Sequence, residues 1–519
     1  MSARRPVLVL VSMSVMSALI WMPTSEVPIA LPHIHRDLGA SFTDLQWMVN
    51  AYTLAVAALL VVMGRVGDLF GRRRLFLTGC AVFSLGAIAA AAAQDTAWLI
   101  ASVAVLGVGS ALVGPTSLAL VVDAFPERMH GRAIGIWGAA SGVGAAVGPM
   151  VGGLLVQGID WRAVFWVNVP LVVAAAALAV LASRESHADR DATGVDVPGA
   201  MAFGGALTAL VLALGQGSIW GWGSAPVLVL LATAAILAAS FVVVDLRRRA
   251  PLIPLREFAT RAFGIALGVL LIGNVVLASL LFVLPLHLQN IDGRSALEAG
   301  ALLLPATATI FVVSPISGWL TDRLGARGPM VAGIVSAALG VYLLSTIDAG
   351  SGPGALAPGL IAVGIGFGLQ ITPVNVVAVE AVPAVSRATA AGVLLTTGMV
   401  GATLGVATFV AVFGGIARAD LPDRLGAEGV TVSAAEEEKL DAAVTGSDEA
   451  QDDLGDFGPA KAQRVETAVD ESFVGALTDV LKGAAALQLL AAALALALPR
   501  RRARETAPAG AVAAAGRGP

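Results

Sequence analysis

The sequence has little charge and a single cysteine. Only 13% of its 519 residues are charged, whereas 57% are hydrophobic and the mean hydropathy is +0.84. Soluble domains carry about a quarter charged residues, so this composition excludes an ordinary soluble globular protein. Cys80, the one cysteine, excludes an intramolecular disulfide and therefore a disulfide-stabilised scaffold.

Patterns typical of catalytic machinery are also missing. The sequence contains no GxxxxGK[ST] phosphate-binding loop, which argues against direct drive by ATP. No His, Asp and Glu residues have metal-ligand spacing, and no nucleophile stands in a pattern with a base. We therefore expect no cofactor, no metal, no nucleic-acid partner and no enzyme activity.

Long apolar runs dominate the chain. They are roughly 18 to 25 residues long, which is the length a helix needs to cross a hydrocarbon core about 30 Å thick. A helix is required because it satisfies its own backbone in lipid, and a barrel would need short alternating strands instead. Buried helices of a large soluble protein are the alternative. We predict fourteen spans, at residues 7–30, 45–68, 74–93, 97–122, 132–157, 162–183, 195–214, 225–245, 262–288, 298–321, 328–347, 355–380, 388–414 and 473–498.

Cations are distributed unevenly between alternate loops. With both termini cytoplasmic, 23 of the 32 Lys and Arg residues lie inside and 9 lie outside, as the positive-inside rule requires. The first span could be taken for a signal peptide, but no convincing cleavage site precedes a soluble domain. We expect a multi-pass protein of the inner (plasma) membrane with both termini cytoplasmic.

A motif after the second span recurs after the tenth. GRVGDLFGRRR returns as GWLTDRLGAR at a constant offset of 254 residues, so that Asp68 corresponds to Asp322. Two repeated halves with a substrate site between them are the plan of many secondary transporters. We expect an N-terminal six-helix half at 1–190, an inserted helix pair at 191–250, a C-terminal six-helix half at 251–498 and a cytoplasmic tail at 499–519.

An acidic segment precedes the last span. Residues 415–472 contain 15 acidic and 5 basic residues. We interpret this segment as a solvated extracellular loop, with the gathering of cations as the alternative.

Asp68 lies near the end of the second span, where the helix dipole is already negative. An acid there requires a cation or a helix N-terminus as its partner. The candidate partners are Arg72 to Arg74 and the start of the thirteenth span near Arg387. An ordinary charged loop is the alternative. The candidate gating residues are Gly64, Asp68, Gly71, Arg72, Arg73, Gly318, Asp322 and Arg323.

The fifth span carries a pattern of small residues. Gly144, Gly148 and Gly152 share one face at intervals of four, which lets another helix approach closely, and Pro149 favours a kink. Generic packing by small residues is the alternative. The full pattern, G-x8-G-x3-G-P-x2-G-G, comprises Gly135, Gly144, Gly148, Pro149, Gly152 and Gly153.

These motifs together resemble the major facilitator superfamily and, within it, the fourteen-helix drug:proton antiporter branch. GRVGDLFGRRR is similar to the family's signature loop between helices 2 and 3, and the glycine pattern is similar to its antiporter signature in helix 5. The segments IALPHIHRDLGAS, LQWMVNAYTLA and QGSIWGWGS also resemble this branch. The resemblance implies an all-α integral membrane protein with a major-facilitator-like fold, two six-helix halves, two inserted helices and fourteen transmembrane helices in all.

The sequence departs from the family pattern at three places. Leu69 stands where the loop motif often has an arginine, although Arg323 occupies the matching place in the repeat. Val103 stands at the usual arginine position of helix 4, and Pro23 at the usual acid position of helix 1, with Glu26 one turn later. The family's proton machinery therefore cannot be transferred unchanged.

Glu26 is the candidate proton-coupling residue. An acid inside a span is costly and usually has a function, and helices 1 and 4 offer no other charge in their central segments. The alternative is a shallow, solvated acid near the outer boundary. Asp123, Glu298 and Glu380 are the next candidates.

We therefore expect a proton-coupled antiporter that exports small lipophilic compounds, cationic ones included. Its partners are the small-molecule substrate, protons and the lipid bilayer, and we expect a monomer. An exporter of a specific endogenous metabolite or lipid and a non-transporting receptor are the alternatives. Residues that could line the substrate cavity, rather than pack between helices, are Trp21, Tyr52, Trp137, Phe282, Gln370, Asn375 and Met399.

Overall fold

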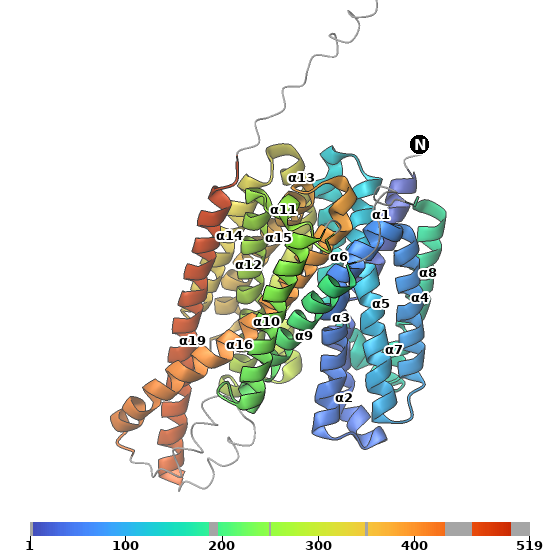
Figure 1. Cartoon of the computed structure of the whole chain (residues 1–519). Helices are drawn as coiled ribbons and strands as arrows, with labels where there is room; N and C mark the ends of the chain where they lie inside the picture. Colours follow the sequence, from blue (N-terminus) through green and yellow to red (C-terminus); the bar gives the residue numbers. More distant parts are fainter. Residues whose placement is uncertain (1–3, 186–195, 249–250, 348–350, 431–458, 500–519) are drawn as a thin grey trace, which may run out of the picture.

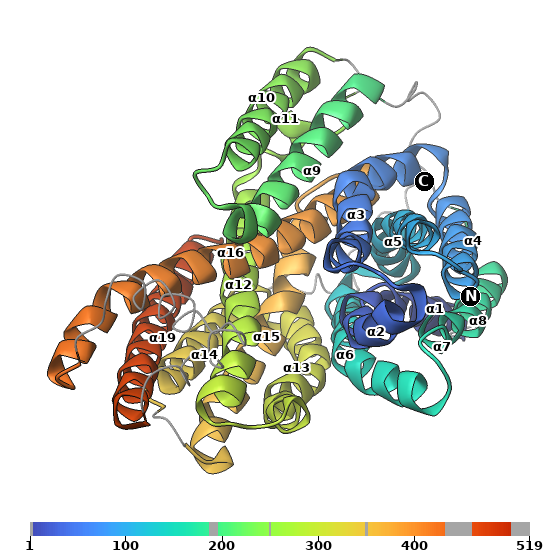
Figure 2. The same ribbon diagram turned by 90° about the horizontal axis from the view of Figure 1, so that it is seen from below.

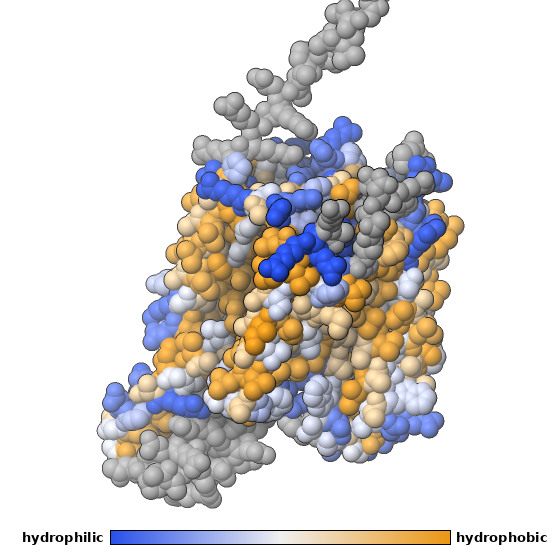
Figure 3. All heavy atoms as spheres, in the orientation of Figure 1, coloured by the Kyte–Doolittle hydropathy of each residue, from blue (hydrophilic) through white to orange (hydrophobic). Residues whose placement is uncertain are grey.

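The computed structural model describes residues 4–185, 196–248, 251–347, 351–430 and 459–499. Within these ranges the chain is helical without strands, and 14 helices are long and apolar enough to span a membrane. The spans match the predicted fourteen in number and order. Apolar side chains cover the sides of the bundle in Figure 3 and polar ones lie at both ends, as a bilayer requires.

The first six spans are built from eight helices, which Figure 1 shows in blue to green. They are α1 (Arg4–Leu19), α2 (Pro23–Leu38), α3 (Phe42–Phe70), α4 (Arg72–Ala91), α5 (Thr96–Ala124), α6 (His130–Gly158), α7 (Ala163–Trp166) and α8 (Asn168–Ala182). The remaining spans are α9 (Val197–Trp220), α10 (Ala225–Arg247), α12 (Arg261–Leu286), α13 (Ala296–Leu324), α14 (Arg327–Leu344), α15 (Pro353–Glu380), α16 (Arg387–Ala427) and α19 (Pro459–Leu496). Short helical turns are η1 (Glu127–Met129), α11 (Leu255–Phe258), the π-helical η2 (His287–Ile291) and η3 (Ala384–Ser386).

The first span is interrupted. α1 ends at Leu19 and α2 starts at Pro23, because proline lacks the N–H that would continue the helical hydrogen bonds. α2 then runs to Leu38, well beyond the predicted end at residue 30. The interruption places Glu26 in the first turn of a new helix rather than in the middle of a continuous one.

The spans form two bundles and a peripheral pair. Figure 2 shows α1 to α8 in one bundle, α12 to α19 in the other, and α9 with α10 beside them. α9 packs on α10 and also contacts α3 and α16. The two bundles meet where α6 contacts α13 and α15, and where α16 contacts α3 and α5.

The contacts between the bundles gather towards one end of the molecule. We call it the motif end: it is where α3 ends and α4 begins, with Gly71 between them, and it lies at the top of Figure 1. α6 and α16 both begin there, next to the ends of α13 and α3. The motif end therefore brings helix N-termini of one bundle against helix C-termini of the other.

The predicted loop 415–472 is shorter than expected. Residues 415–427 continue α16, and 459–472 belong to α19. Both stretches are helical because Leu421 and Leu425 share a buried apolar cluster with Val465 and Val469, and because Arg424 bonds Glu471 at 2.8 Å. The middle of the acidic segment and the tail 500–519 lie outside the described residues.

Candidate functional site

Glu26 is completely buried. Asn168 at the start of α8 donates from Nδ2 to Glu26 Oε1 at 3.0 Å and to the carbonyl of Val164 at 2.9 Å. Both Glu26 and Asn168 are 0% exposed. Glu26 is thus not the shallow, solvated acid of the alternative interpretation, and it lies inside the first bundle between α2, α6 and α8.

The glycine face of α6 packs against the first span, as its spacing predicts. A Cβ atom on Gly144 would collide with the carbonyl of Ala18, and one on Gly148 would collide with Ser25 Oγ. At Gly152 a Cβ would lie 3.2 Å from the Cα of Glu26. The small residues therefore allow α6 to approach the backbone on which Glu26 stands.

The other members of the pattern have different surroundings. A Cβ on Gly135 would come 2.7 Å from the carbonyl of Ser314 on α13, in the other bundle. Gly153 has open space around its Cβ direction, and Pro149 is exposed on a helix that continues through it.

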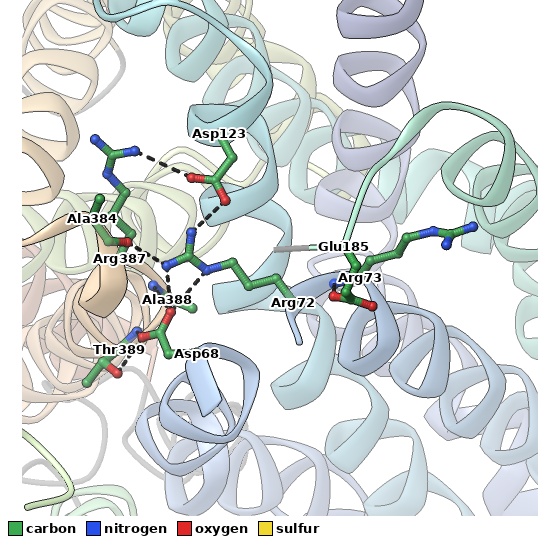
Figure 4. Close-up of polar contacts among 9 residues, drawn as sticks. All are labelled: Asp68, Arg72, Arg73, Asp123, Glu185, Ala384, Arg387, Ala388 and Thr389. Atoms are coloured by element: carbon green, nitrogen blue, oxygen red, sulfur yellow. Dashed lines mark hydrogen bonds and ion pairs between the residues drawn. The ribbon is translucent and has the colours of Figure 1, made fainter. Parts of the chain in front are cut away.

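Asp68 bridges the two bundles at the motif end (Figure 4). Its Oδ1 accepts from Arg72 Nη2 at 2.7 Å and from the backbone N–H of Ala388 at 3.1 Å. Its Oδ2 accepts from the backbone N–H of Thr389 at 2.8 Å and from Thr389 Oγ1 at 2.7 Å. Both predicted kinds of partner are therefore present, the adjacent arginine and the N-terminus of the thirteenth span.

Arg72 extends this contact to α5 and η3. Its Nη1 lies 2.5 Å from Asp123 Oδ2, and its Nη2 also donates to the carbonyl of Ala384 at 2.7 Å. Asp123 in turn lies 3.4 Å from Arg387 Nη1 at the start of α16. Two acids and two arginines thus form a network of balanced charge across the bundles (Figure 4).

Asp322 repeats this geometry with the bundles exchanged. Its carboxylate accepts from the backbone N–H groups of Gly131 at 2.8 Å and Arg132 at 3.2 Å, at the N-terminus of α6. Gly318 approaches the carbonyl of Gly131, just as Gly64 approaches that of Ala388.

A second internal correspondence explains the symmetry. Ala388 and Thr389 stand 257 residues after Gly131 and Arg132, and the same offset relates Glu380 to Asp123 and Arg387 to His130. The ion pair of Arg387 with Asp123 at 3.4 Å therefore has a counterpart, in which His130 Nδ1 lies 3.5 Å from Glu380 Oε1. Each bundle therefore contributes one acidic and one basic side chain to these two ion pairs with the other bundle.

The two contacts differ in their cations. Arg72 on the first side corresponds to Ala326 on the second, and Arg387 corresponds to His130, which is charged only when protonated. Arg323 does not supply this charge, because its guanidinium lies over the ring of Trp319 at 4.2 Å. Arg132, which corresponds to Thr389, places its Nε 3.6 Å from Asp322 Oδ2. The Asp322 side thus has one arginine in its ion pairs, whereas the Asp68 side has Arg72 and Arg387.

Gly71 and Arg73 shape the turn between α3 and α4. Gly71 has φ 113°, and a Cβ on it would lie 2.6 Å from Glu185 Oε1. Glu185 accepts from the backbone N–H of Arg73 at 3.1 Å, and Arg73 Nη2 donates to the carbonyl of Val180 at 2.8 Å. These contacts stay within the first bundle.

Several predicted cavity residues hold helices together. Tyr52 donates to the carbonyl of Ile20 and bonds Ser110 Oγ at 2.9 Å. The remaining polar contacts are Trp137 Nε1 to Ser117 Oγ at 3.2 Å, Gln370 Nε2 to the carbonyl of Val269 at 3.2 Å, and Asn375 Nδ2 to the carbonyl of Ile371 at 3.1 Å. Phe282 is 38% exposed and meets Phe409 edge-on, and Trp21 and Met399 are half-buried.

Sequence reasoning missed Asn168 and the His130–Glu380 pair. The offset of 257 residues between DAFPERMHGRA and EAVPAVSRATA carries a signal for the pair. Asn168 has no comparable signal, because a single asparagine at the start of an apolar span is compatible with many environments.

Comparison with known proteins agrees with this architecture. The family model described as Major Facilitator Superfamily matches residues 9–406. The tetracenomycin C resistance and export protein of Streptomyces glaucescens is 35% identical over 404 residues, which cover 78% of this chain and 74% of that protein. The puromycin resistance protein pur8 of Streptomyces alboniger is 35% identical over 410 residues, covering 78% of this chain and 81% of its own length. The multidrug resistance protein Stp of Mycobacterium tuberculosis (strain ATCC 25618 / H37Rv) is 35% identical over 405 residues, covering 78% and 75%.

Solved structures share the fold at low identity. The human organic anion transporter MFSD10 (TETRAN) aligns with TM-score 0.58 at 13% identity, over 95% of this chain and 100% of its own. A bacterial homolog of the human lysosomal transporter Spinster, inward-facing and unoccupied, aligns with TM-score 0.51 at 18% identity, over 96% and 98%. With fourteen membrane helices and a family match across most of its length, the chain belongs to the Major Facilitator Superfamily of membrane transporters.

Proposed function

We propose that this transporter is an antiporter that couples inward proton movement to the export of small lipophilic compounds. The observation that carries the proposal is Glu26, a carboxyl group that is 0% exposed inside a membrane bundle and forms no ion pair within the described part of the chain. An acid in such a place costs at least about 2.5 kcal/mol. Binding a proton removes that cost, so Glu26 is suited to take up and release one.

The substrate class is supported by the relatives. Three proteins at 35% identity carry names that describe export of, or resistance to, an antibiotic or several drugs. We propose that the present chain likewise exports lipophilic compounds, including cationic ones. A substrate confined to one endogenous metabolite or lipid is the competing proposal, and the breadth of the transported set separates the two.

We propose that the contacts of Asp68 and Asp322 hold the motif end closed. Each carboxylate binds two backbone N–H groups of the opposite bundle, where the helix dipole favours an anion. Gly64 and Gly318 allow the close approach, and Gly71, Arg72 and Arg73 shape the loop beside it. Opening the motif end requires that both sets of contacts break, as alternating access demands.

We further propose that the motif end is cytoplasmic. The split of 23 cations against 9 supports this orientation. With the motif end cytoplasmic and closed, the structure is an outward-facing state. Both termini then lie in the cytoplasm of a bacterial-type cell. We propose a monomer with halves 1–190 and 251–498 and the inserted pair 191–250, in which the two halves of a single chain supply both sides of the contacts at the motif end.

The test is transport into everted membrane vesicles. Puromycin, tetracenomycin C and a lipophilic cationic dye are offered with and without an imposed proton gradient. We expect gradient-dependent uptake of more than one compound by the wild type and no uphill uptake by Glu26→Gln, which keeps its shape but cannot titrate.

Three results would change the proposal. Uphill uptake by Glu26→Gln at the wild-type rate would move the carrier to another acid. Uptake of one compound alone would favour a dedicated exporter. No flux of any compound in vesicles that contain inserted protein would favour a receptor without transport.

A further inference from the structure

Two buried acceptor atoms of the Glu26–Asn168 pair lack a hydrogen-bond donor. Glu26 Oε2 and Asn168 Oδ1 have no hydrogen-bond partner among the residues that the structure describes. An ionised carboxylate only accepts hydrogen bonds, and so does an amide oxygen. Buried acceptors without donors are rare in folded proteins, so each requires an explanation.

The orientation of the Asn168 amide is determined by its neighbours. Nδ2 has two hydrogens, one directed to Glu26 Oε1 at 3.0 Å and one to the carbonyl of Val164 at 2.9 Å. Turning the amide over would set Oδ1 against both of these acceptors. The oxygen therefore stays available on the amide group that already bonds the carboxyl.

One proton on Glu26 would give both of these oxygen atoms a hydrogen bond. A proton on Glu26 Oε2 changes that atom into a donor, and Asn168 Oδ1 is an acceptor on the amide that already donates to Oε1. A carboxylic acid and a primary amide can form two reciprocal hydrogen bonds in this way, whereas a carboxylate and an amide can form only one.

No described cation competes for Glu26. α6 presents Gly152, which has no side chain, and α8 presents Asn168. On α3 the titratable neighbour is Tyr52, whose hydroxyl bonds Ile20 and Ser110. Beyond the far end of α2, Arg162 bonds Asp37 at 2.7 Å and Asp160 at 3.3 Å, so these ions are paired with one another.

We propose that Asn168 is the positioning residue for the transported proton, holding Glu26 as a protonated carboxyl group through a reciprocal amide–acid pair. This inference rests on the proposed role of Glu26. A proton from water forms the O–H bond on Oε2, and the same bond breaks when the proton leaves, without a redox step.

Infrared difference spectroscopy of the purified full-length protein tests the pair. At neutral pH we expect a carbonyl stretch from a hydrogen-bonded carboxylic acid that is absent from Glu26→Gln. In Asn168→Leu the band should move to the higher frequency of an acid without its partner. Asn274→Leu is the matched control, because Asn274 also bonds the carbonyl four residues earlier, at 3.0 Å, but stands in the other bundle; its band should match the wild type.

A second variant, Asn168→Asp, tests the pair even if Asn168→Leu does not fold. Asn168→Asp keeps the shape and lets two carboxyl groups share one proton, so the pH of half-maximal proton-driven export should rise by about one unit. An unshifted band in folded Asn168→Leu, or an unchanged pH profile in Asn168→Asp, would overturn the inference. Uphill export by Glu26→Gln would instead refute the proposed role of Glu26 and move the carrier to another acid.

Discussion

At the scale of single residues, Asp68 shows how one carboxylate can hold two bundles together. Its oxygens receive hydrogen bonds from Arg72, from two consecutive backbone N–H groups and from the Thr389 hydroxyl. Asp68 is 0% exposed and Arg72 only 3%. Removing one partner of such a buried pair costs about 3–5 kcal/mol, because the other charge remains buried.

Asp68→Asn is expected to insert normally but to export roughly tenfold more slowly, since the closed motif end loses its anion. Export is measured in vesicles. The population of the closed state is measured as the distance between spin labels at Arg128 and Val385, which are exposed on opposite bundles, in a Cys80→Ser background.

Asp95→Asn is the matched control for this prediction. Asp95 caps α5 by accepting from the backbone N–H of Trp98 at 2.8 Å, and asparagine caps a helix equally well. Wild-type export and an unchanged distance distribution in Asp68→Asn would show that Asp68 has no role in gating.

At the scale of elements, α6 links the buried acid to the gate. Its first residues donate backbone N–H groups to Asp322 in the other bundle, and Gly152 near its end packs against Glu26. Because α6 contacts both places, a tilt of α6 would change both contacts, and we propose this as the route that couples protonation of Glu26 to opening of the motif end.

His130→Arg tests the ion pair that corresponds to Asp123–Arg387. Arginine is always charged, so its pair with Glu380 would be a permanent one, and the closed state should become more populated. The spin-label distances between Arg128 and Val385 should then show a larger closed fraction than in the wild type.

The reverse substitution, Arg387→His, is the control for this prediction. It replaces a permanent cation opposite Asp123 by a side chain that is charged only when protonated, so its closed state should be less populated. Equal closed fractions in wild type and His130→Arg would show that the histidine does not limit closure.

At the scale of the whole molecule, the proposed gate, which is formed by the contacts of Asp68 and Asp322 between the bundles, is isologous. Because the bundles are related by internal repetition, a contact from a residue of the first bundle to the second recurs in the opposite direction, as in a twofold dimer. The pairs His130–Glu380 and Asp123–Arg387 illustrate this relation. One closing motion therefore forms two sets of contacts at once.

The proposed orientation predicts which end of the molecule is accessible. Single cysteines at Gln94, in the turn between α4 and α5, and at Arg128, in η1 at the motif end, replace exposed residues. In a Cys80→Ser background an impermeant maleimide should label intact cells at residue 94 and should label residue 128 only after permeabilisation. Labelling of residue 128 in intact cells would invert the topology.

The amino-acid sequence alone determined the fourteen spans, because apolar length is a local property that lipid imposes on each helix separately. It also indicated that Asp68 needs a helix N-terminus near Arg387, since the dipole argument depends only on position along a helix. The face of α6 that is formed by Gly144, Gly148 and Gly152, and that another helix approaches closely, followed in the same way from helical spacing.

Only the tertiary structure decided which atoms meet. The pairing of Glu26 with Asn168, across 142 residues, depends on how α2 and α8 are packed around Gly152, and no local pattern carries that information. The same holds for residues 415–427 and 459–472, which contain many polar residues yet are helical, because Leu421 and Leu425 share a buried apolar cluster with residues of α19. Burial and hydrogen bonding between distant segments are collective properties of the packed bundles, and these properties decide whether an acid in the sequence is solvated or a candidate proton carrier.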